Sequence, residues 1–408
     1  MYSKNAAEME KCMKTIAFVC PWFGENIPGG AEMELRGLTT HLNESGLKLE
    51  ILTTCVEKFA SDWNVNFYKA GCDTVCGLKV RRFPVRKRDV KRFDAVNYKF
   101  MNNIPVSEAE EKIYMQEMVN STALYDYIRD NKDNYALFVY IPYMFGTTYE
   151  GVGVCPHKSV LIPCLHDESY AYMKLFAKRY SQAAGMIFHS KPEYELAKKL
   201  YGSNYNGVVL GEGVDTGLNY DAEGFRKKFG ITEPFILYAG RKEEGKNVHT
   251  LLKYFAHYKK ENNNNLKLVL VGGGQIAIPE SVKGDVIDLG FVSLQDKTNA
   301  ESAALLLCNP SKFESFSLVI MESWLCRRPV IVYGGCGVTR NFVSESNGGL
   351  YFNGYYEFEG AVNYIMKHPD IADVMGNNGY AYVNKEFAWD VIVRKYTEYF
   401  KELAAKVN

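Results

Sequence analysis

The sequence predicts an α/β fold in which two Rossmann-like domains, each with a doubly wound parallel sheet, face each other across a cleft. The chain has 408 residues. That is more than one ordinary core accommodates, so two domains of about 200 residues each are expected. A pattern of strand, loop and helix runs along the chain in two successive series. Apolar residues make up 47% of the chain, which is sufficient for two sizeable cores.

The first series begins with an apolar strand at 15–20, a loop at 21–30 and an amphipathic helix at 31–45. A strand at 47–53 follows. This strand–helix–strand opening implies parallel strands joined by a right-handed crossover. Further elements of the series are strands at 135–141, 159–165, 185–189 and 207–210 and a helix at 192–201.

A polar segment at 216–234, with three glycines and a terminal proline, is the predicted connection between the domains. The second series follows it. We expect an N-terminal domain over 1–216, a C-terminal domain over 217–385, and a last helix, 386–408, that packs back on the N-terminal domain. The expected elements of the second series are strands at 235–239, 266–271, 286–289, 304–308 and 329–333 and a helix at 247–260.

Composition excludes several classes of protein. The 48 basic and 48 acidic residues cancel, whereas a nucleic-acid binder carries a basic excess. No apolar run approaches the roughly 20 residues of a membrane span, and residues 1–14 lack the apolar core of a signal peptide. The closest cysteines, Cys72 and Cys76, have no His or Cys nearby to complete a zinc site. We therefore expect a cytoplasmic protein with free thiols and no metal or cofactor.

Two glycine-bearing loops follow strands, where doubly wound sheets bind ligands. Gly29 and Gly30 precede a helix whose first amides favour an anion, although a plain tight turn is the alternative. Gly240 is followed by Arg241 and Lys246 on a loop that opens a helix. Arginine offers a planar fork and lysine a mobile charge, so the pair suits a diphosphate and the charge that develops as it leaves. A solvated loop with incidental charge is the alternative.

Glu314 and Glu322 stand with seven residues between them, after the strand at 304–308. Ser317 is a predicted helix cap, with the amides of Leu318 and Val319 left for a phosphate. Glu322 then lies roughly 7.5 Å along the helix, about the span from a diphosphate to the ribose of a nucleotide. One glutamate thus addresses a sugar and the other a ribose diol. Surface glutamates that flank a helix start are the alternative.

Among the histidines and the known nucleophile motifs, only His166 is a candidate for the active site. His166 follows a strand, where its ring can bond a sugar hydroxyl, with Tyr170 and Tyr172 as a stacking surface; a structural histidine is the alternative. No G-x-S-x-G and no Walker lysine loop occurs. His249 and His257 lie within one predicted helix and are expected to be solvated or capping. The sequence suggests no partner for His41, His157, His189 and His368.

Together these features resemble the GT-B retaining glycosyltransferases, specifically family 4 (group 1). The resemblance covers nearly the whole chain and is strongest over 235–350. It depends on the Gly29-Gly30 loop, the His166-Asp167 pair, the Arg241/Lys246 pair and the Glu-x7-Glu of Glu314 and Glu322, in the family's order.

The resemblance implies that the domain over 1–216 binds the acceptor and the domain over 217–385 the nucleotide-sugar donor, and it implies a role for each motif. The two cations bind the donor diphosphate, Glu314 contacts the donor sugar, and Glu322 contacts the ribose. His166 lies beside the transferred sugar, and the anomeric configuration is retained as the leaving phosphate helps to deprotonate the acceptor. The expected catalytic residues are His166, Glu314, Arg241 and Lys246, and the expected donor-binding residues are Gly29, Gly30, Gly240, Ser317, Leu318, Val319 and Glu322.

The sequence departs from the family at two positions. Ser317 and Arg327 stand where relatives usually carry glycine or, at the second position, a small residue. These departures bear on the phosphate geometry rather than on the fold. There is no Asp-x-Asp motif, so a metal-independent reaction without a cofactor is expected.

The sequence does not identify the base or the sugar of the donor. A GDP-, UDP- or similar nucleotide-linked hexose is therefore expected. Segment 79–92 carries eight basic residues in fourteen, and each cation near an anionic membrane adds about 1 kcal/mol. We therefore expect peripheral contact with the inner face of the plasma membrane and a glycan or lipid-linked acceptor, as in cell-surface polysaccharide synthesis. A solvated charged strand and loop is the alternative.

Two other functions remain open. A non-catalytic GT-B relative would act as a binding or stabilising partner, and such relatives typically lose a phosphate cation or a glutamate, which this chain retains. A nucleotide-sugar epimerase of the same fold is the second. Release of nucleoside diphosphate that depends on an acceptor distinguishes a transferase from both.

Overall fold

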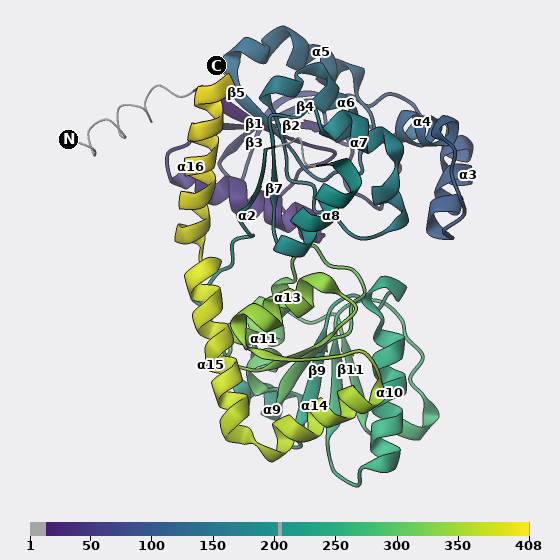
Figure 1. The fold of residues 1–408 in the computed structure, drawn as a ribbon, viewed down its shortest axis with the longest axis vertical. Helices are drawn as coiled ribbons and strands as arrows, with labels where there is room; N and C mark the ends of the chain where they lie inside the picture. The colour runs from purple at the N-terminus through teal and green to yellow at the C-terminus, as the bar shows by residue number, and fades with distance from the viewer. Residues whose placement is uncertain (1–13, 203–205, 408) are drawn as a thin grey trace, which may run out of the picture. The chain divides into compact units, whose positions relative to one another are not determined.

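The computed structural model describes residues 14–202 and 206–407. The chain forms two compact units, Met1–Gly213 with Asp390–Asn408, and Val214–Trp389. Each unit contains one sheet with helices around it (Figure 1). The predicted class of two α/β domains with parallel sheets is therefore confirmed. Residues 1–13, in which no signal peptide is predicted, lie outside the described residues.

The sheet of the first unit has eight strands in the order β3-β4-β2-β1-β5-β6-β7-β8. All neighbours are parallel except β3 and β4. Strands β1, β2 and β5 are almost wholly buried, as expected for a parallel sheet covered on both faces. The strands are β1 (Thr15–Cys20), β2 (Leu49–Thr54), β3 (Gly71–Val75), β4 (Leu78–Phe83), β5 (Tyr135–Tyr140), β6 (Ser159–Leu161), β7 (Gly185–Phe188) and β8 (Gly207–Val209).

The helices of the first unit include the last helix of the chain, α16, whose Phe400 ring lies 6.2 Å from the Phe18 ring of β1. Tyr396 of the same helix donates to the Gly211 carbonyl at 3.2 Å. The helices are α2 (Gly30–Glu44), α3 (Val90–Met101), α4 (Glu108–Glu117), α5 (Thr122–Asn131), α6 (Gly146–Val154), α7 (Lys174–Tyr180), α8 (Lys191–Tyr201) and α16 (Trp389–Val407).

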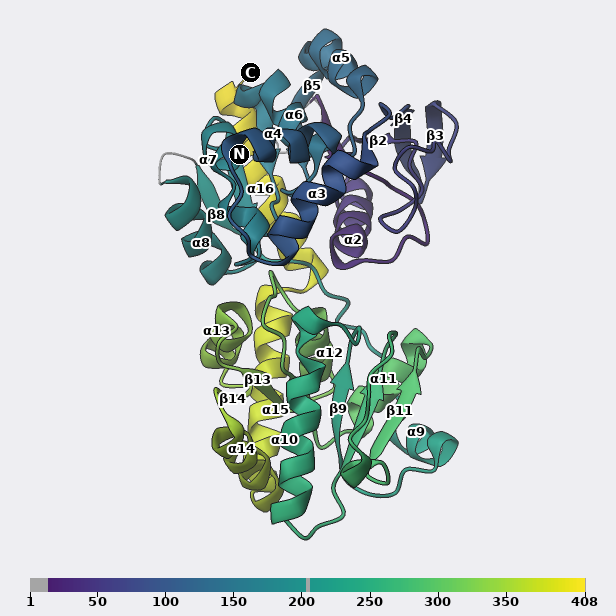
Figure 2. The same ribbon diagram turned by 90° about the vertical axis from the view of Figure 1, so that its right-hand side faces the viewer.

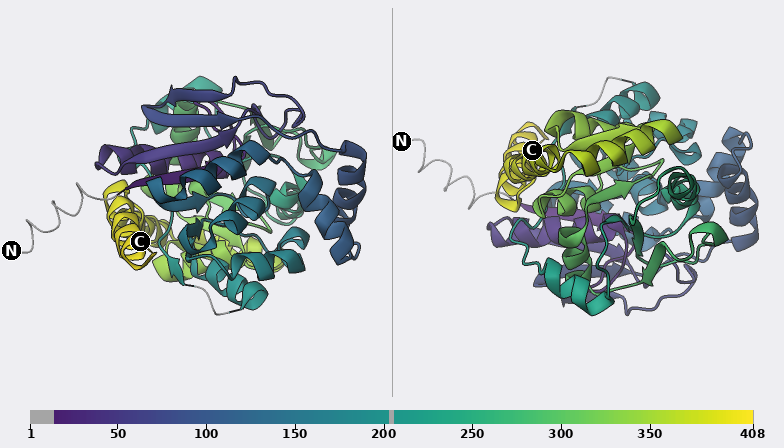
Figure 3. Two further views of the ribbon diagram at one scale, coloured as in Figure 1. Left: turned by 90° about the horizontal axis from the view of Figure 1, so that it is seen from above. Right: turned by 90° about the horizontal axis from the view of Figure 1, so that it is seen from below.

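The β3–β4 hairpin is not among the predicted elements. Cys76 and Gly77 form its turn with φ of 52° and 72°, values typical of the two-residue turn that suits the twist of a hairpin. Leu78, Val80 and Phe83 of β4 are buried, and the charged residues between them hide this alternation in the sequence. The strands at this edge, purple to blue in Figure 3, lie side by side.

Most basic side chains of segment 79–92 bind acidic groups or carbonyl oxygens within the first unit. Arg82 is buried, donates to the Phe23 carbonyl at 2.9 Å and stacks 3.9 Å from the Tyr68 ring. Lys87 and Lys91 are exposed. The other basic residues have acidic or carbonyl partners: Lys79 and Arg81 pair with Glu50, and Arg86, Arg88 and Arg92 contact Glu117 or its carbonyl.

The sheet of the second unit has six parallel strands in the order β11-β10-β9-β12-β13-β14. The chain runs outward from β9 to β11 and then returns to β12, on the other side of β9. The loops that follow β9 and β12 therefore diverge at the carboxyl edge of the sheet, where such folds bind ligands. The strands are β9 (Phe235–Ala239), β10 (Lys267–Val271), β11 (Val286–Gly290), β12 (Leu306–Asn309), β13 (Val330–Tyr333) and β14 (Gly349–Phe352).

Helices cover both faces of this sheet (Figure 2). Helices α10 and α14 share one apolar core with the strands, while α9 packs on α11 and α12 packs on α15. Among the described residues, no helix of either unit combines the length and apolar composition that a membrane span requires. The helices are α9 (Ala222–Phe229), α10 (Val248–Glu261), α11 (Leu294–Ala303), α12 (Leu318–Leu325), α13 (Gly337–Ser346), α14 (Tyr355–Lys367) and α15 (Pro369–Glu386).

Candidate active site

The loop after β9 is held close to the loop after β10 by glycines and one buried lysine. Gly240 has φ of 152°, and a Cβ on Gly272 would lie 2.1 Å from the Gly240 carbonyl oxygen. Lys242 has a fully buried side chain that contacts Asp288 at 2.7 Å and the Gly272 carbonyl at 2.6 Å. Lys242 thus anchors the loop, whereas Arg241 is exposed and pairs with Glu243 at 3.1 Å. The sequence analysis did not single out Lys242.

Two of the predicted catalytic residues meet in the structure. Lys246 Nζ lies 2.8 Å from Glu314 Oε1, and both side chains are partly buried. Hydrogen bonds to backbone carbonyls bring their loops together: the side-chain amide of Asn247 donates to the Pro310 carbonyl at 3.1 Å, and the backbone amide of Lys312 donates to the Gly245 carbonyl at 3.1 Å. The loops after β9 and β12 therefore place an ammonium and a carboxylate at one point of the sheet edge.

The start of α12 lies in the same loop as Glu314. Ser317 occupies the N-cap position, but the prediction that its side chain caps the helix is wrong. Its hydroxyl instead accepts a hydrogen bond from Asn309 at 2.9 Å, because a φ of 153° turns the side chain away from the helix. Amides in the first turn of a helix have no intrahelical acceptor. The first turn at Leu318 and Val319 has no side-chain cap among the described residues.

Both departures from the family pattern fall at backbone positions that favour glycine. Ser317 has φ of 153° and Arg327 has φ of 55°. A side chain in the left-handed region costs roughly 1–2 kcal/mol relative to glycine. Arg327 partly offsets this cost, because its guanidinium lies 3.8 Å from the Tyr380 ring centroid and it donates to Asn377.

We expect Arg327→Gly to be more stable than Arg327→Ala by about 1 kcal/mol in urea unfolding. Both variants lose the guanidinium contacts, so the difference reports the backbone alone. The matched pair at Arg328, whose φ is not positive, should show the opposite order, with alanine the more stable. The same order at both positions would contradict the left-handed conformation of Arg327.

Glu322 lies on α12 beside charged groups of α11. Its Oε1 accepts a hydrogen bond from Lys297 Nζ at 2.6 Å. Glu301, fully buried nearby, has its pKa raised well above the ordinary value by burial and then by the Glu322 charge. Within the described residues no N–H or O–H group donates to either Glu301 oxygen. Glu301 is therefore a neutral acid that neighbours the predicted ribose ligand, and the sequence analysis identified neither Glu301 nor Lys297.

Glu301 makes the stability of the second unit depend on pH. Its folded-state pKa is raised, so above the ordinary pKa the unfolded chain ionises while the folded chain does not, and stability falls as pH rises. Each pKa unit of difference is worth about 1.4 kcal/mol. We expect Glu301→Gln to unfold at a higher urea concentration than wild type at pH 8 and at a similar one at pH 4. A gap independent of pH would show that Glu301 is ionised in the folded protein.

His166 lies in the first unit, in the loop that follows β6. His166 Nδ1 lies 3.7 Å from Glu168 Oε1, which also accepts a hydrogen bond from Tyr143 at 3.0 Å. Burial raises the pKa of Glu168, but hydrogen bonding and charge from His166 and a hydrogen bond from Tyr143 lower it by more. The net shift of the Glu168 pKa is therefore downward. Glu168 is thus an anion that orients the His166 ring. Of the two predicted stacking tyrosines, Tyr172 is exposed, whereas Tyr170 packs in the core and donates to Asn97.

Gly29 and Gly30 precede and begin α2. Gly29 has φ of 140°, and a Cβ there would lie 1.9 Å from a Glu32 oxygen. Glu32 is held by the Trp22 indole at 2.6 Å, so glycine is required for the turn. A Cβ on Gly30 would meet nothing within 4 Å, which leaves space beside the first amides of α2.

Comparison with known proteins identifies the class to which this arrangement belongs. HepE from Anabaena, solved in complex with UDP, has a TM-score of 0.70 at 15% identity and matches 95% of this chain and 100% of its own. Sucrose-phosphate synthase from Thermosynechococcus elongatus has a TM-score of 0.69 at 17% identity and matches 96% of this chain and 100% of its own. The fold is that of the GT-B glycosyltransferases.

Sequence comparison is more specific. The family model for Glycosyl transferases group 1 matches residues 221–382, which is the family that the motifs of the sequence resemble. An uncharacterized glycosyltransferase of Methanocaldococcus jannaschii is 26% identical over 208 residues, 48% of this chain and 53% of that protein. The alpha-D-kanosaminyltransferase of Streptomyces kanamyceticus is 23% identical over 163 residues, 38% of this chain and 42% of the enzyme. The chain spans about half the length of these curated relatives.

Proposed function

We propose that this protein is a retaining glycosyltransferase that moves a hexose from a nucleoside diphosphate sugar to a glycan or lipid-linked acceptor, without a metal ion. The observation that carries the proposal is the meeting of Lys246 and Glu314 in the loop that leads into α12. Lysine and the first amides of α12 suit the two phosphates, since both offer donors to anionic oxygens. Glu314 and Glu322 then address the sugar and the ribose.

Arg241 complements this set as a second cation. Its exposed guanidinium pairs with Glu243 in the absence of ligand, and a diphosphate offers a stronger, bidentate partner. His166, held by the Glu168 anion, is assigned to a hydroxyl of the transferred sugar. Among the charged groups of these loops, cations and helix amides replace the metal ion that would otherwise neutralise the leaving diphosphate.

The direct test is nucleotide binding followed by turnover. A panel of nucleoside diphosphates is compared by thermal shift, and the HepE complex makes UDP the first choice. Binding at 100 times Kd stabilises the protein by about 2.7 kcal/mol. The matching donor should then release nucleoside diphosphate only when an acceptor is present, in the presence of EDTA. Binding without any acceptor-dependent release would favour a non-catalytic relative, and a change in the donor sugar would favour an epimerase.

Lipid contact is a second, separate part of the proposal. Since most basic residues of 79–92 have internal partners, we assign contact with anionic headgroups to the exposed Lys87 and Lys91. Two cations are worth about 2 kcal/mol at an anionic surface. We expect the Lys87→Ala/Lys91→Ala variant to lose roughly 30-fold in binding to phosphatidylserine vesicles. Lys253→Ala, an exposed lysine of α10, should bind as wild type does. If binding of the wild type to vesicles does not depend on their content of anionic lipid, the proposed lipid contact is wrong.

A further inference from the structure

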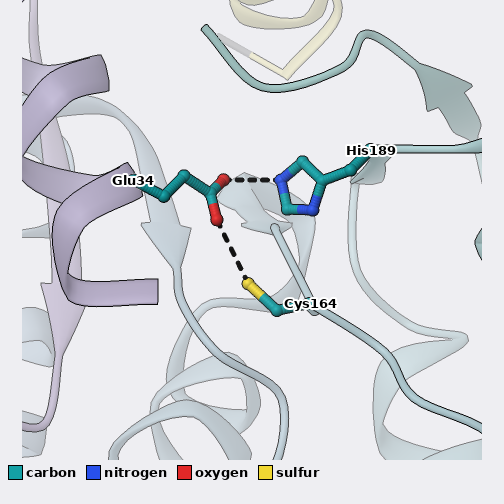
Figure 4. Close-up of side chains that lie close together, drawn as sticks. All are labelled: Glu34, Cys164 and His189. Atoms are coloured by element: carbon teal, nitrogen blue, oxygen red, sulfur yellow. Dashed lines mark hydrogen bonds and ion pairs between the residues drawn. The ribbon is translucent and has the colours of Figure 1, made fainter. Parts of the chain in front are cut away.

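A cluster of three buried or half-buried side chains lies in the first unit, apart from the residues assigned to the reaction. Glu34 comes from α2, Cys164 follows β6 and His189 follows β7, and their side chains point toward one another (Figure 4). Glu34 Oε1 lies 2.5 Å from His189 Nε2, and Cys164 Sγ lies 3.4 Å from Glu34 Oε2. One ligand atom from each residue lies within 4.8 Å of the others. The prediction that His189 has no partner is therefore wrong.

The surroundings of this Glu34–Cys164–His189 cluster are negative. Burial lowers the pKa of His189, but Glu34 and Glu193 raise it, with a net value of about 10. Burial, followed by Glu34, Glu193 and Glu212, raises the pKa of the Cys164 thiol.

Glu193, which lies beside the cluster, binds two backbone amides. Its two carboxylate oxygens accept the amides of Leu165 and His189, each at 2.6 Å. These bonds fix the ends of β6 and β7 next to each other and leave Glu193 committed to the backbone. The backbone that carries Cys164 and His189 is therefore held in place without help from the cluster itself.

We propose that the Glu34–Cys164–His189 cluster binds Zn²⁺ or a divalent cation of similar softness. A thiolate, an imidazole and a carboxylate are the ligand types that zinc takes, whereas Mg²⁺ and Ca²⁺ require oxygen. Metal binding exchanges any proton on Cys164 Sγ or His189 Nε2 for the ion, and that proton leaves to solvent.

The distances suit this exchange. Ligands of a tetrahedral zinc, with Zn–S of about 2.3 Å and Zn–O of about 2.0 Å, are about 3.5 Å apart. The separation of Cys164 Sγ and Glu34 Oε2, 3.4 Å, matches. When Glu34 coordinates through Oε2, its Oε1 gives up the 2.5 Å hydrogen bond with His189 Nε2, and that nitrogen becomes available to the metal. The flexible Glu34 side chain permits that movement, and the fourth position remains for water.

The role differs from that of a catalytic metal. The cluster belongs to the first unit, and none of its members is assigned to the donor. Metal at this place cross-links α2 to the ends of β6 and β7, and Cys164 lies two residues before His166. The metal therefore takes no part in the transfer step.

The test uses the full chain after removal of metal by a chelator. Co²⁺ is titrated in, and the thiolate-to-cobalt charge-transfer band is recorded. Wild type should take up one ion per chain with this band, and Zn²⁺ should displace it. Cys164→Ser should lose the band, and Glu34→Gln should bind at least tenfold more weakly. Cys72→Ser, which removes an exposed thiol, serves as the matched control and should behave as wild type.

Two further measurements keep the outcome decisive. Metal uptake should release protons, measured in weak buffer, and circular dichroism should show that each variant is folded. Absence of the band in wild type, or its persistence in Cys164→Ser, would overturn the proposal. Lys246→Ala should bind Co²⁺ as wild type does. Failure of the metal site is thus distinguishable from failure of the donor site.

Discussion

Lys246→Ala is expected to lower turnover about 10²- to 10³-fold, the usual cost of removing one group that stabilises charge in a transition state. The ammonium contacts Glu314 at 2.8 Å in the absence of ligand, and no other lysine or arginine is paired with that carboxylate among the described residues. A diphosphate leaving group would then develop its charge with Arg241 as its remaining loop cation. The loss should appear mainly in kcat when the lysine acts on the leaving group.

The measurement is the initial rate of nucleoside diphosphate release with a saturating acceptor. Lys253→Ala removes an exposed lysine from the adjoining helix α10 and should retain wild-type rates. Lys246→Arg retains the charge but not the point-like ammonium, so an intermediate rate is expected. Equal rates for Lys246→Ala and Lys253→Ala would refute the assignment of Lys246 to the diphosphate.

Trp324→Ala is expected to destabilise the second unit by about 3–5 kcal/mol, the range for deletion of a large buried side chain. Trp324 is fully buried on α12, and its indole donates to the Gly348 carbonyl at 2.8 Å. A Cβ on Gly379 of α15 would lie 2.2 Å from the indole, so the two helices are in close contact here. The loss is a large fraction of a typical stability of 5–15 kcal/mol.

Urea unfolding measures the stability of the Trp324→Ala variant, and a binding assay measures its affinity for nucleotide. Nucleotide affinity should fall with stability, because Trp324 holds the helix that begins beside Glu314 and carries Glu322. Gly379→Ala approaches the same contact from α15 and should cost roughly 1–3 kcal/mol by overpacking. Tyr356→Ala, at a side chain that is 81% exposed, should change stability by about 0.5 kcal/mol or less. A Trp324→Ala effect no larger than that of Tyr356→Ala would contradict the packing described.

Several elements follow from the sequence to the residue. Strands β1 (Thr15–Cys20) and β9 (Phe235–Ala239) match their predicted bounds, because each is a continuous apolar run with polar or proline neighbours. Strand β4 was missed, since charged residues alternate with Leu78 and Val80 along it. The predicted cap at Ser317 failed for a different reason: its backbone has φ of 153°, and no residue type other than glycine announces such a conformation.

For the candidate site, too, the sequence predicted some features and only the structure gave the others. The motifs that contain Lys246 and Glu314 are legible in the sequence, but their 2.8 Å contact joins residues 68 apart. The contact between Glu34 and His189 joins residues 155 apart, and the sequence suggested no partner for His189. Glu301 and Lys297 were missed because a buried acid beside a second acid has no local pattern.

The sequence by itself determined the two series of strands and helices, the loops at the carboxyl ends of the strands, and the charged and glycine residues that those loops carry. These properties are local, since periodicity and turn chemistry extend over a few residues. Only the tertiary structure decided which side chains meet. Strand order places β9 beside β12 and β6 beside β7, and that order depends on burial summed over each whole sheet rather than on any one segment.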